Sequence, residues 1–171
     1  RLEMRAEIRR IHRQLGRSTI YVTHDQDEAL SLADRIVVMK DGTARQVAAP
    51  AEVYANPADL DVARFMGYRN EVAMKVDRHD GATVVASGRG LTLTGTAKAD
   101  MPPGTAVRAA LRPDEVVLGD GPNAFDATVD LLEYGGRDSL VDVITSGGVR
   151  LHVRSAKPVR IGDKVRASVP P

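Results

Sequence analysis

Nine short runs of β-branched and other apolar residues follow one another between residues 72 and 169, and they limit the possible folds more than any other feature. Glycine, proline, aspartate or asparagine separates each run from the next. Many short strands at such spacing are typical of a small barrel or sandwich. The predicted strands are 72–76, 83–86, 91–93, 107–111, 116–118, 127–132, 140–144, 149–153 and 164–169.

Residues 1–67 have a different pattern, in which helical periodicity alternates with short apolar runs. Apolar residues three or four positions apart predict a helix over residues 2–15 and others near 26–33, 50–56 and 58–66. The runs 18–23, 35–40 and 43–47 predict strands. The unbroken apolar pattern of residues 18–23 favours burial on both faces, as in a parallel sheet. We therefore expect two domains, 1–67 and 68–171.

Three local signals sharpen the expectations for the first domain. Asp25 is expected to cap the helix that follows, and Glu28 to return the bond in a capping box. Asp41-Gly42 predicts a two-residue hairpin turn. Pro50 suits the first position of a helix. Ala49 before it offers no capping side chain, a lack that costs ~0.5–2 kcal/mol.

The charge and cysteine counts exclude several classes of function. The 24 basic and 23 acidic residues give a net charge of +1, which argues against a nucleic-acid-binding protein. The absence of cysteine excludes disulfides and thiolate metal sites and fits a reducing compartment. No apolar run approaches the ~20 residues of a membrane helix, and no secretory leader is visible. We therefore expect a cytoplasmic protein.

Basic residues are concentrated in the first predicted helix, where only Glu3 and Glu7 oppose them. A solvated helix face explains this pattern, and a docking face for another subunit is the alternative. The arginines are Arg1, Arg5, Arg9, Arg10, Arg13 and Arg17.

His24 lies where the apolar run 19–22 ends and the predicted helix beginning after Asp25 starts. Backbone N–H groups and the positive end of the helix dipole make such junctions natural anion sites. A histidine there can donate to a phosphate oxygen or orient an attacking water. A buried histidine that satisfies a helix end is the alternative interpretation. The spacing of Asp25 and Glu28 is explained by capping, so we do not interpret them as a catalytic carboxylate pair.

The residues around His24 have a specific resemblance. Residues 21–26 (Tyr-Val-Thr-His-Asp-Gln), followed by residues 28–39, resemble the switch-histidine segment of the ATPase subunits of ABC transporters, in the subfamily that serves bacterial importers. More loosely, residues 111–114 and 132–136 resemble turns of the appended TOBE-type regulatory domain. Between these segments the resemblance continues at Gly42, Gln46, 50–54, Asn56-Pro57 and 65–67.

This resemblance implies the fold class. Residues 1–67 would be an α/β remnant, the end of a P-loop NTPase domain that includes the switch-histidine loop. Residues 68–171 would be an all-β OB-like barrel of the TOBE or MOP type. The strands near 20–22 and 36–39 would then belong to the centre of a large sheet. Left bare, such strands invite pairing, so we expect residues 1–47 to self-associate or to pack irregularly.

The resemblance also implies the site and its cofactors. His24 would contact the γ-phosphate of ATP held between two subunits, as the one catalytic and ATP-binding residue identified in this chain, which offers no metal ligands. The phosphate loop G-x-x-x-x-G-K-[ST] is absent, as are the strand ending in Asp-Glu and the signature Ser-Gly-Gly-Gln. ATP and Mg²⁺ would therefore be bound mainly by an N-terminal part, and this chain alone is expected to be inactive.

The implied partners are transmembrane permease subunits, a second copy of the chain in a homodimer and, indirectly, a substrate-binding protein, with no nucleic acid. The subunit would be peripheral at the inner face of the cell membrane. The alternative is a free-standing sensor, since similar barrels bind oxyanions such as molybdate. Only 4% of the residues are aromatic, which disfavours an oligonucleotide-binding barrel. His12, His79 and His152 are expected to be surface residues.

Overall fold

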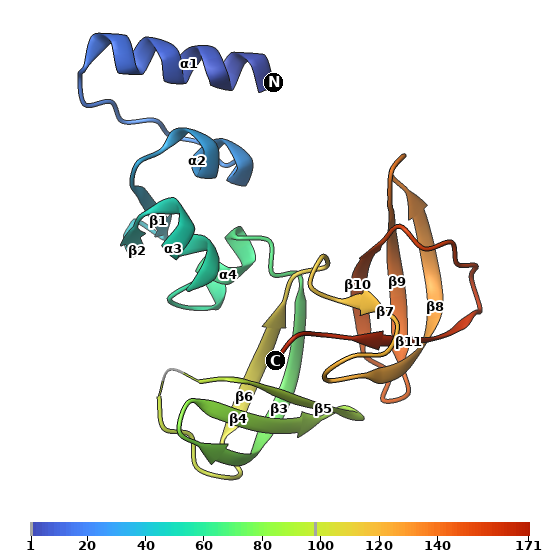
Figure 1. The fold of residues 1–171 in the computed structure, drawn as a ribbon. Helices are drawn as coiled ribbons and strands as arrows, with labels where there is room; N and C mark the ends of the chain where they lie inside the picture. The colour runs from blue at the N-terminus through green and yellow to red at the C-terminus, as the bar shows by residue number, and fades with distance from the viewer. Residues whose placement is uncertain (1, 98) are drawn as a thin grey trace. The chain divides into compact units, whose positions relative to one another are not determined.

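The computed structural model describes residues 2–97 and 99–171 (Figure 1). The chain divides into two compact units, which we call unit 1 (Arg1–Gly67) and unit 2 (Tyr68–Pro171). Among the described residues, no helix is long and apolar enough to cross a bilayer.

Unit 1 contains four helices and one hairpin among its described residues. Helix α1 (Leu2–Leu15) is followed by Gly16, whose N–H donates to the His12 carbonyl 3.1 Å away. As predicted, Asp41 and Gly42 form the hairpin turn, with φ of 51° and 74°, values that few residues other than glycine and asparagine or aspartate adopt. The elements are α1 (Leu2–Leu15), α2 (Gln26–Leu32), β1 (Ile36–Lys40), β2 (Thr43–Ala48), α3 (Pro50–Ala55) and α4 (Leu60–Phe65).

The predicted strand over residues 18–23 is wrong. This segment has no regular secondary structure, and the side chains of Ile20 and Val22 are 93% and 90% exposed. A strand needs a neighbour to pair its backbone polar groups, and no strand of the described chain lies beside this one. The expectation that residues 1–47 pack irregularly holds for this segment only, since α1, α2 and the β1–β2 hairpin are regular. Self-association of residues 1–47 stays a prediction.

Two of the predicted features of the helix starts in unit 1 are confirmed, the cap of α2 and the uncapped start of α3, and one prediction, the return bond of the capping box, is wrong. Asp25 caps α2, since its Oδ1 accepts from the N–H of Glu28 at 3.0 Å. The reciprocal bond of the capping box is absent, because the Asp25 N–H donates to Thr23 Oγ1 instead. Helix α3 begins at Pro50 with no capping side chain on Ala49, as predicted.

Ion pairs connect the β1–β2 hairpin to the start of α4. Asp59 caps α4, with its Oδ1 accepting from the N–H groups of Asp61 and Val62 at 2.9 and 3.0 Å. Lys40 Nζ lies 2.6 Å from Asp61, and Arg45 lies 2.8 Å from Asp59. These bonds lower the pKa of both carboxyl groups, for Asp59 chiefly through the Val62 N–H and for Asp61 chiefly through Lys40. The buried residues of unit 1 are Ile36, Val38, Val53, Val62, Ala63 and Met66.

Unit 2 is built of strands, and each of the nine predicted strands is confirmed. Tight turns at the predicted glycine and aspartate positions connect them, for example at Gly81 and Gly90. The elements are β3 (Asn70–Asp80), β4 (Thr83–Gly88), β5 (Leu91–Thr96), β6 (Ala106–Leu111), β7 (Val117–Leu118), β8 (Phe125–Tyr134), β9 (Ser139–Thr145), β10 (Arg150–Ser155) and β11 (Lys164–Ser168).

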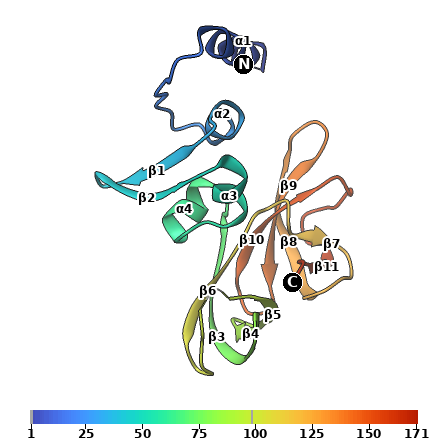
Figure 2. The same cartoon turned by 60° about the vertical axis from the view of Figure 1, so that its left-hand side comes forward.

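The strands of unit 2 form two modules with the same antiparallel topology (Figures 1 and 2). The first module has the order β5-β4-β3-β6, and the second has the order β10-β9-β8-β11 with β7 added at its edge. Beyond β7 the second module nearly closes, because the Arg154 N–H of β10 donates to the Pro113 carbonyl at 2.8 Å. The second module is therefore a nearly closed barrel of the OB-like type, and unit 2 is almost entirely β.

The two modules bind each other through a reciprocal pair of asparagines. The Asn70 side chain bonds the N–H and carbonyl of His152 on β10, at 2.7 and 2.8 Å. The Asn123 side chain bonds the N–H and carbonyl of Thr94 on β5, at 2.7 and 2.8 Å. Asn70 begins β3, the first strand of its module, and bonds β10, the third strand of the other module. Asn123 precedes β8, the first strand of its module, and bonds β5, the third strand of the other. The contact is therefore reciprocal, because each module supplies one asparagine and one strand to it.

One hydrophobic core serves both modules. Residues of the first module such as Val72 and Leu91 pack with residues of the second module such as Val141 and Leu151, and all four are buried. Burial of one such side chain contributes ~1.5–3 kcal/mol relative to exposure. Neither sheet has a complete core without the other.

Candidate functional site

The candidate site is the loop of residues 21–28 in unit 1, which we call the His24 loop. It enters α2 at Asp25, where two hydrogen bonds fix the backbone. The Asp25 N–H donates to Thr23 Oγ1 at 3.0 Å, and the Glu28 N–H donates to Asp25 Oδ1 at 3.0 Å. His24, which lies between Thr23 and Asp25, forms a bend.

Glu28 holds the other side of the loop. Its Oε2 accepts from the Thr23 hydroxyl at 2.7 Å and from the Tyr21 hydroxyl at 3.1 Å. The bond to Glu28 raises the pKa of the Tyr21 phenol, because ionising the phenol would remove its proton and set a second negative charge beside the carboxylate. The glutamate expected to complete a capping box therefore secures the approach to the helix.

Helix α1 supports the same loop. Arg5 Nη2 lies 3.5 Å from Asp25 Oδ1, and Arg9 Nη1 donates to the Ser31 carbonyl at 3.0 Å. Arg10 pairs with Glu7 on the helix itself at 2.6 Å. The arginines of α1 are therefore not a uniformly solvated face: Arg5 and Arg9 contact α2, and Arg1 lies outside the described residues. Sequence periodicity could not reveal these contacts, because they depend on how the two helices cross.

The His24 side chain is exposed, and within residues 2–97 and 99–171 no hydrogen bond or ion pair holds its ring. The carboxylate of Asp25 already occupies the start of α2, so the Glu28 N–H is not free for an external anion. A ligand at this loop would therefore meet the imidazole itself rather than the helix terminus. Because the loop backbone is held in place and the imidazole is free, His24 is suited to binding or orienting a ligand from outside the chain.

The described residues do not fit a magnesium site. Among them, no group of three or more histidine, aspartate or glutamate side chains is arranged to hold a metal ion. Mg²⁺ prefers oxygen ligands in octahedral geometry, and the carboxylates of Asp25 and Glu28 in the His24 loop are already engaged in capping and hydrogen bonding. The described residues therefore offer no ligand set for Mg²⁺.

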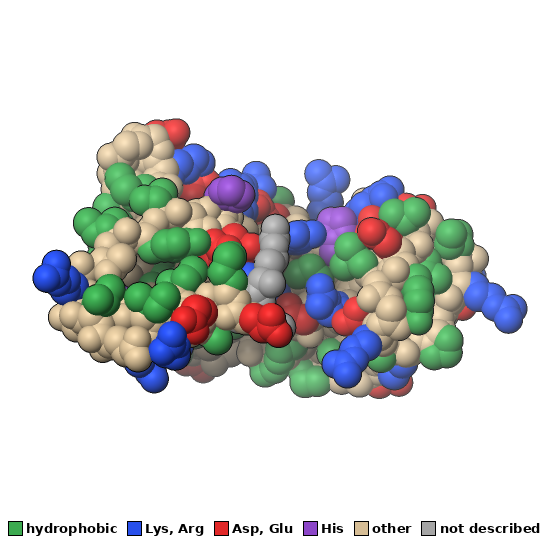
Figure 3. Space-filling model, turned by 90° about the horizontal axis from the view of Figure 1, so that it is seen from above, with side chains coloured by type: hydrophobic (Ala, Val, Ile, Leu, Met, Phe, Trp, Pro, Cys, Tyr) green, Lys and Arg blue, Asp and Glu red, His purple; other side chains and the backbone are tan. Residues whose placement is uncertain are grey.

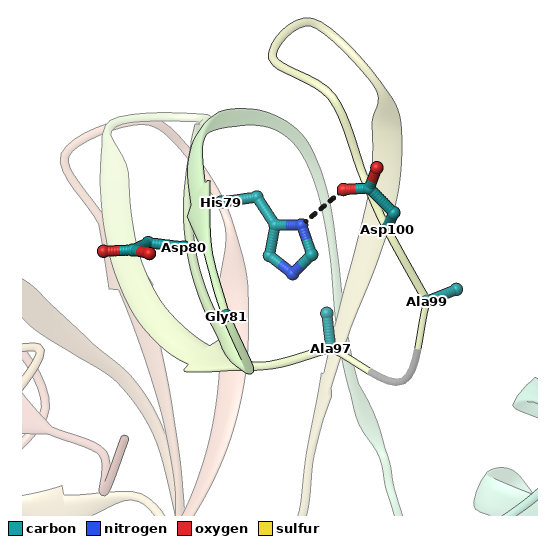
Figure 4. Close-up of a pocket in the computed structure, with 6 residues that line it drawn as sticks. All are labelled: His79, Asp80, Gly81, Ala97, Ala99 and Asp100. Carbon is teal, nitrogen blue, oxygen red and sulfur yellow. Dashed lines mark hydrogen bonds and ion pairs between the residues drawn. The ribbon is translucent and has the colours of Figure 1, made fainter.

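His79 is not the surface residue that the sequence predicted. Its side chain is only 10% exposed and borders a hollow of about 390 Å³, which is also lined by the β3–β4 turn and by Ala97, Ala99 and Asp100 (Figure 4). Its Nδ1 lies 2.9 Å from Asp100 and 3.2 Å from the Met101 N–H. Its Nε2 is buried with no hydrogen-bond partner among the described residues. Asp80 points away from the ring, so this hollow presents too few converging polar groups to define a ligand.

His152 lies in a charged cluster on the second module. Its Nδ1 is 2.6 Å from Asp142, which is buried and lies 3.4 Å from Arg150. Arg150 also pairs with Asp130 at 2.9 Å. The acids and bases satisfy one another, which is the usual condition for burying a carboxylate. This cluster therefore explains how Asp142 is accommodated and does not require a ligand.

The turn at Arg112 has the fold-defining role expected for it. The Arg112 guanidinium lies 4.4 Å from the centre of the Tyr68 ring, and its Nη2 donates to the Tyr68 hydroxyl at 2.7 Å. Its backbone N–H donates to Glu115 at 2.8 Å. These contacts fasten the segment between β6 and β7 to the beginning of unit 2.

Figure 3 shows one face of the molecule, on which acidic and basic side chains are interspersed rather than gathered by sign. Nucleic-acid binding requires a concentrated basic surface. The face in view has no such concentration among the described residues.

The family described as "TOBE domain" matches residues 109–171. The sn-glycerol-3-phosphate import ATP-binding protein UgpC of Chromohalobacter salexigens is 40% identical over 144 residues, which cover 82% of this chain and 38% of that protein.

Two further relatives carry different names. The Fe(3+) ions import ATP-binding protein FbpC 2 of Rhizobium meliloti is 39% identical over 80% of this chain and 37% of its own length. The spermidine/putrescine import ATP-binding protein PotA of Rubrobacter xylanophilus is 36% identical over 96% of this chain and 46% of its own. The chain thus spans less than half the length of these curated relatives.

A solved structure shares the fold of part of the chain. The cytoplasmic molybdate-binding protein ModG, crystallised with molybdate bound, superposes with a TM-score of 0.52 at 18% identity. The match covers 59% of this chain and 89% of ModG. At this identity the likeness concerns the fold alone, and it agrees with the OB-like architecture of unit 2.

Proposed function

Since this chain belongs to the family of ATP-binding subunits of ABC importers, we propose that its parent protein binds and hydrolyses ATP to drive import of a small solute. Unit 1, residues 1–67, would be the α/β end of the ATPase domain. Unit 2 would be the regulatory domain, in which the TOBE family match lies. The chain would supply the His24 loop, while the phosphate loop and the ligands of Mg²⁺ would come from the parent protein.

The exposed imidazole on a fixed loop is the observation that supports this role. Thr23, Asp25 and Glu28 hold the backbone on both sides of His24, while the ring stays free. We infer that the ring hydrogen-bonds the γ-phosphate of ATP across a homodimer and positions it together with the attacking water. Phosphoryl transfer depends mainly on such positioning and charge stabilisation.

The partners follow from this assignment. Transmembrane permease subunits would couple ATP binding to transport, a second copy would complete the ATP site, and a substrate-binding protein would deliver the solute. The subunit would lie at the inner face of the cell membrane. The cargo is not assigned, because the relatives are named for a phosphate ester, a ferric ion and polyamines, which share no recognition chemistry.

Unit 2 alone could bind an oxyanion, and this alternative is less well supported. The chain resembles ModG in fold only, whereas its sequence relatives extend through unit 1. In unit 2, the Lys157 ammonium is engaged with the Leu118 carbonyl.

The test is His24→Ala in the intact parent subunit. We expect ATP to bind with nearly unchanged affinity and turnover to fall about 10²–10⁴-fold, the range typical of a lost positioning or proton-transferring group. His12→Ala, which removes an imidazole from α1 in the same unit, is the matched control and should leave turnover unchanged. Near-normal hydrolysis by His24→Ala would refute the assignment.

A further inference from the structure

Helix α1 contacts both ends of α2 through two of its arginines. Arg5 and Arg9 are four residues apart on α1, so their side chains lie on the same face of the helix. Arg5 Nη2 lies 3.5 Å from Asp25 Oδ1 at the start of α2, and Arg9 Nη1 donates at 3.0 Å to the carbonyl of Ser31 in its last turn. Figures 1 and 2 show the two helices next to each other within unit 1. A shift of α1 would therefore displace α2.

Arg5 differs from the other described arginines of this helix in its burial. Its side chain is 15% exposed, whereas Arg9, Arg10 and Arg13 are exposed residues. Its Nε is buried with no hydrogen-bond partner among the described residues. Burying a charged group is costly unless it is paired, and the carboxylate of Asp25 pairs with this guanidinium. An apolar side chain could fill the same place without that cost, so packing alone does not explain the arginine.

The carboxylate beside Arg5 is also the one that caps α2. Asp25 Oδ1 accepts from the Glu28 N–H at 3.0 Å and lies 3.5 Å from Arg5 Nη2, so one oxygen atom makes both contacts. The backbone N–H of Asp25 donates to Thr23 Oγ1 at 3.0 Å. His24 lies between Thr23 and Asp25, and its ring forms no hydrogen bond or ion pair with the described residues. The backbone that Asp25 anchors therefore determines where the imidazole lies.

We propose that Arg5 is a positioning residue for the reaction at His24. The guanidinium holds the Asp25 carboxylate in its capping position, and the capped turn holds the imidazole where it meets the γ-phosphate of ATP. In this role Arg5 acts through Asp25 and has no contact with ATP. The role rests on the proposed function of His24. A misplacement of about 1 Å can slow an enzymatic reaction about 10²-fold, so a small shift of the cap has a measurable effect.

The role requires the charge of Arg5 more than the shape of its guanidinium. Arg5 approaches Asp25 through Nη2 at 3.5 Å, and no paired contact of two nitrogens with two oxygens is needed to hold the cap. A lysine ammonium is a point charge on a flexible stem, and it can take the same place. Arg5→Lys should therefore preserve the function that Arg5→Met removes.

Steady-state kinetics on the intact parent subunit test the role of Arg5 in the reaction. Arg5→Met removes the charge and keeps most of the side-chain length, so kcat should fall about 10–10²-fold while the Kd for ATP stays nearly unchanged. Arg5→Lys should have a kcat close to that of the wild type. Arg13→Met, at an exposed position of the same helix, is the matched control and should leave kcat unchanged. A normal kcat for Arg5→Met, or equally low values for Arg5→Met and Arg5→Lys, would overturn the proposal.

A double variant tests whether Arg5 acts through Asp25. Asparagine caps helices as well as aspartate does, so Asp25→Asn removes the charge and keeps the cap. Once the partner charge is gone, the second substitution has little left to remove. The kcat of the variant with both Arg5→Met and Asp25→Asn should therefore be close to that of the slower single variant. Effects that multiply would show that the two residues act independently and would overturn the proposal.

Amide hydrogen exchange on the 171-residue chain tests the same contact without ATP. The Glu28 N–H is bonded to Asp25 Oδ1. Arg5→Met should raise its exchange rate about tenfold, because a cap that loses its charged partner opens more often. Arg13→Met should leave the rate unchanged, and far-UV circular dichroism establishes that both variants are folded.

The two measurements distinguish a failure of this proposal from a failure of the proposed function. An unchanged Glu28 exchange rate in Arg5→Met would overturn the role of Arg5 and leave the assignment of His24 standing. Faster exchange in Arg5→Met together with near-normal hydrolysis by His24→Ala would instead refute that assignment, and with it any role of Arg5 in the reaction.

Discussion

Units 1 and 2 use their apolar residues in opposite ways. In unit 2, the strands of two modules enclose one core, and its apolar side chains such as Val141 and Leu151 are fully buried. In unit 1, only a few residues around Val53 and Met66 are buried, while Ile20 and Val22 are bare. Residues with the same apolar character thus have different environments according to whether neighbouring strands are present.

This difference shows that an apolar run predicts a strand only where it has a pairing partner. Val22 and Val143 are equally apolar, but Val143 lies between β8 and β10, whereas the segment of Val22 has no strand beside it in the described chain. We infer that unit 2 contributes most of the stability of this chain. Three measurements test this difference between the units.

The largest effect is expected from truncating a core side chain in unit 2. Leu151→Ala leaves a cavity in a fully buried site, so we expect the free energy of unfolding to fall by ~2–5 kcal/mol. Val22→Ala, on the bare segment of unit 1, should change it by less than ~0.5 kcal/mol. Urea denaturation followed by circular dichroism measures both. Similar losses for the two variants would contradict the contrast between the units.

A smaller effect is expected where the two modules meet. Asn70→Ala removes both hydrogen bonds to the His152 backbone and leaves buried polar groups unpaired, at a cost of ~1–3 kcal/mol. Asn123→Ala should cost less, because Asn123 is only half-buried. The same denaturation experiment compares them. If Asn70→Ala were neutral, the reciprocal pair would not hold the modules together.

The smallest effect concerns unit 1 and depends on pH. The pKa of Asp59 is lowered in the folded state, so its contribution to stability is complete above the ordinary value of about 4. That contribution is lost as pH falls through the lower, folded-state pKa. Asp59→Ala should therefore cost ~0.5–2 kcal/mol at pH 7 and progressively less toward pH 2.

Urea titrations at several pH values measure this trend. A cost for Asp59→Ala that stays constant from pH 7 to pH 2 would exclude an ionised cap.

Local sequence rules correctly predicted those parts of the fold that residues close together in sequence determine. The turn at Asp41-Gly42, the uncapped start of α3 and the nine strands of unit 2 depend on short patterns, and the structure confirms them. The strand over 18–23 failed because pairing depends on residues far away. The two-module arrangement was also not visible, since Asn70 and His152 are 82 residues apart.

The candidate site was predictable to a similar extent. The position of His24 at a loop before a helix followed from the sequence, as did the cap by Asp25. The contacts of Arg5 and Arg9 with α2 did not, because they arise from helix packing. The burial of His79 was also missed, since its ring contacts Asp100 and Met101, which are 21 and 22 residues further along the chain.

The shared core of unit 2 determines where this polypeptide can be divided. The TOBE family match begins at residue 109, inside β6, and so leaves β3, β4 and β5 outside it. A polypeptide starting there would lack Val72, Leu91 and Asn70, whose side chain bonds β10. The core side chains of its remaining strands would then be exposed to water. The smallest autonomous piece is therefore all of unit 2, and excision at the limits of the sequence family should yield an insoluble product.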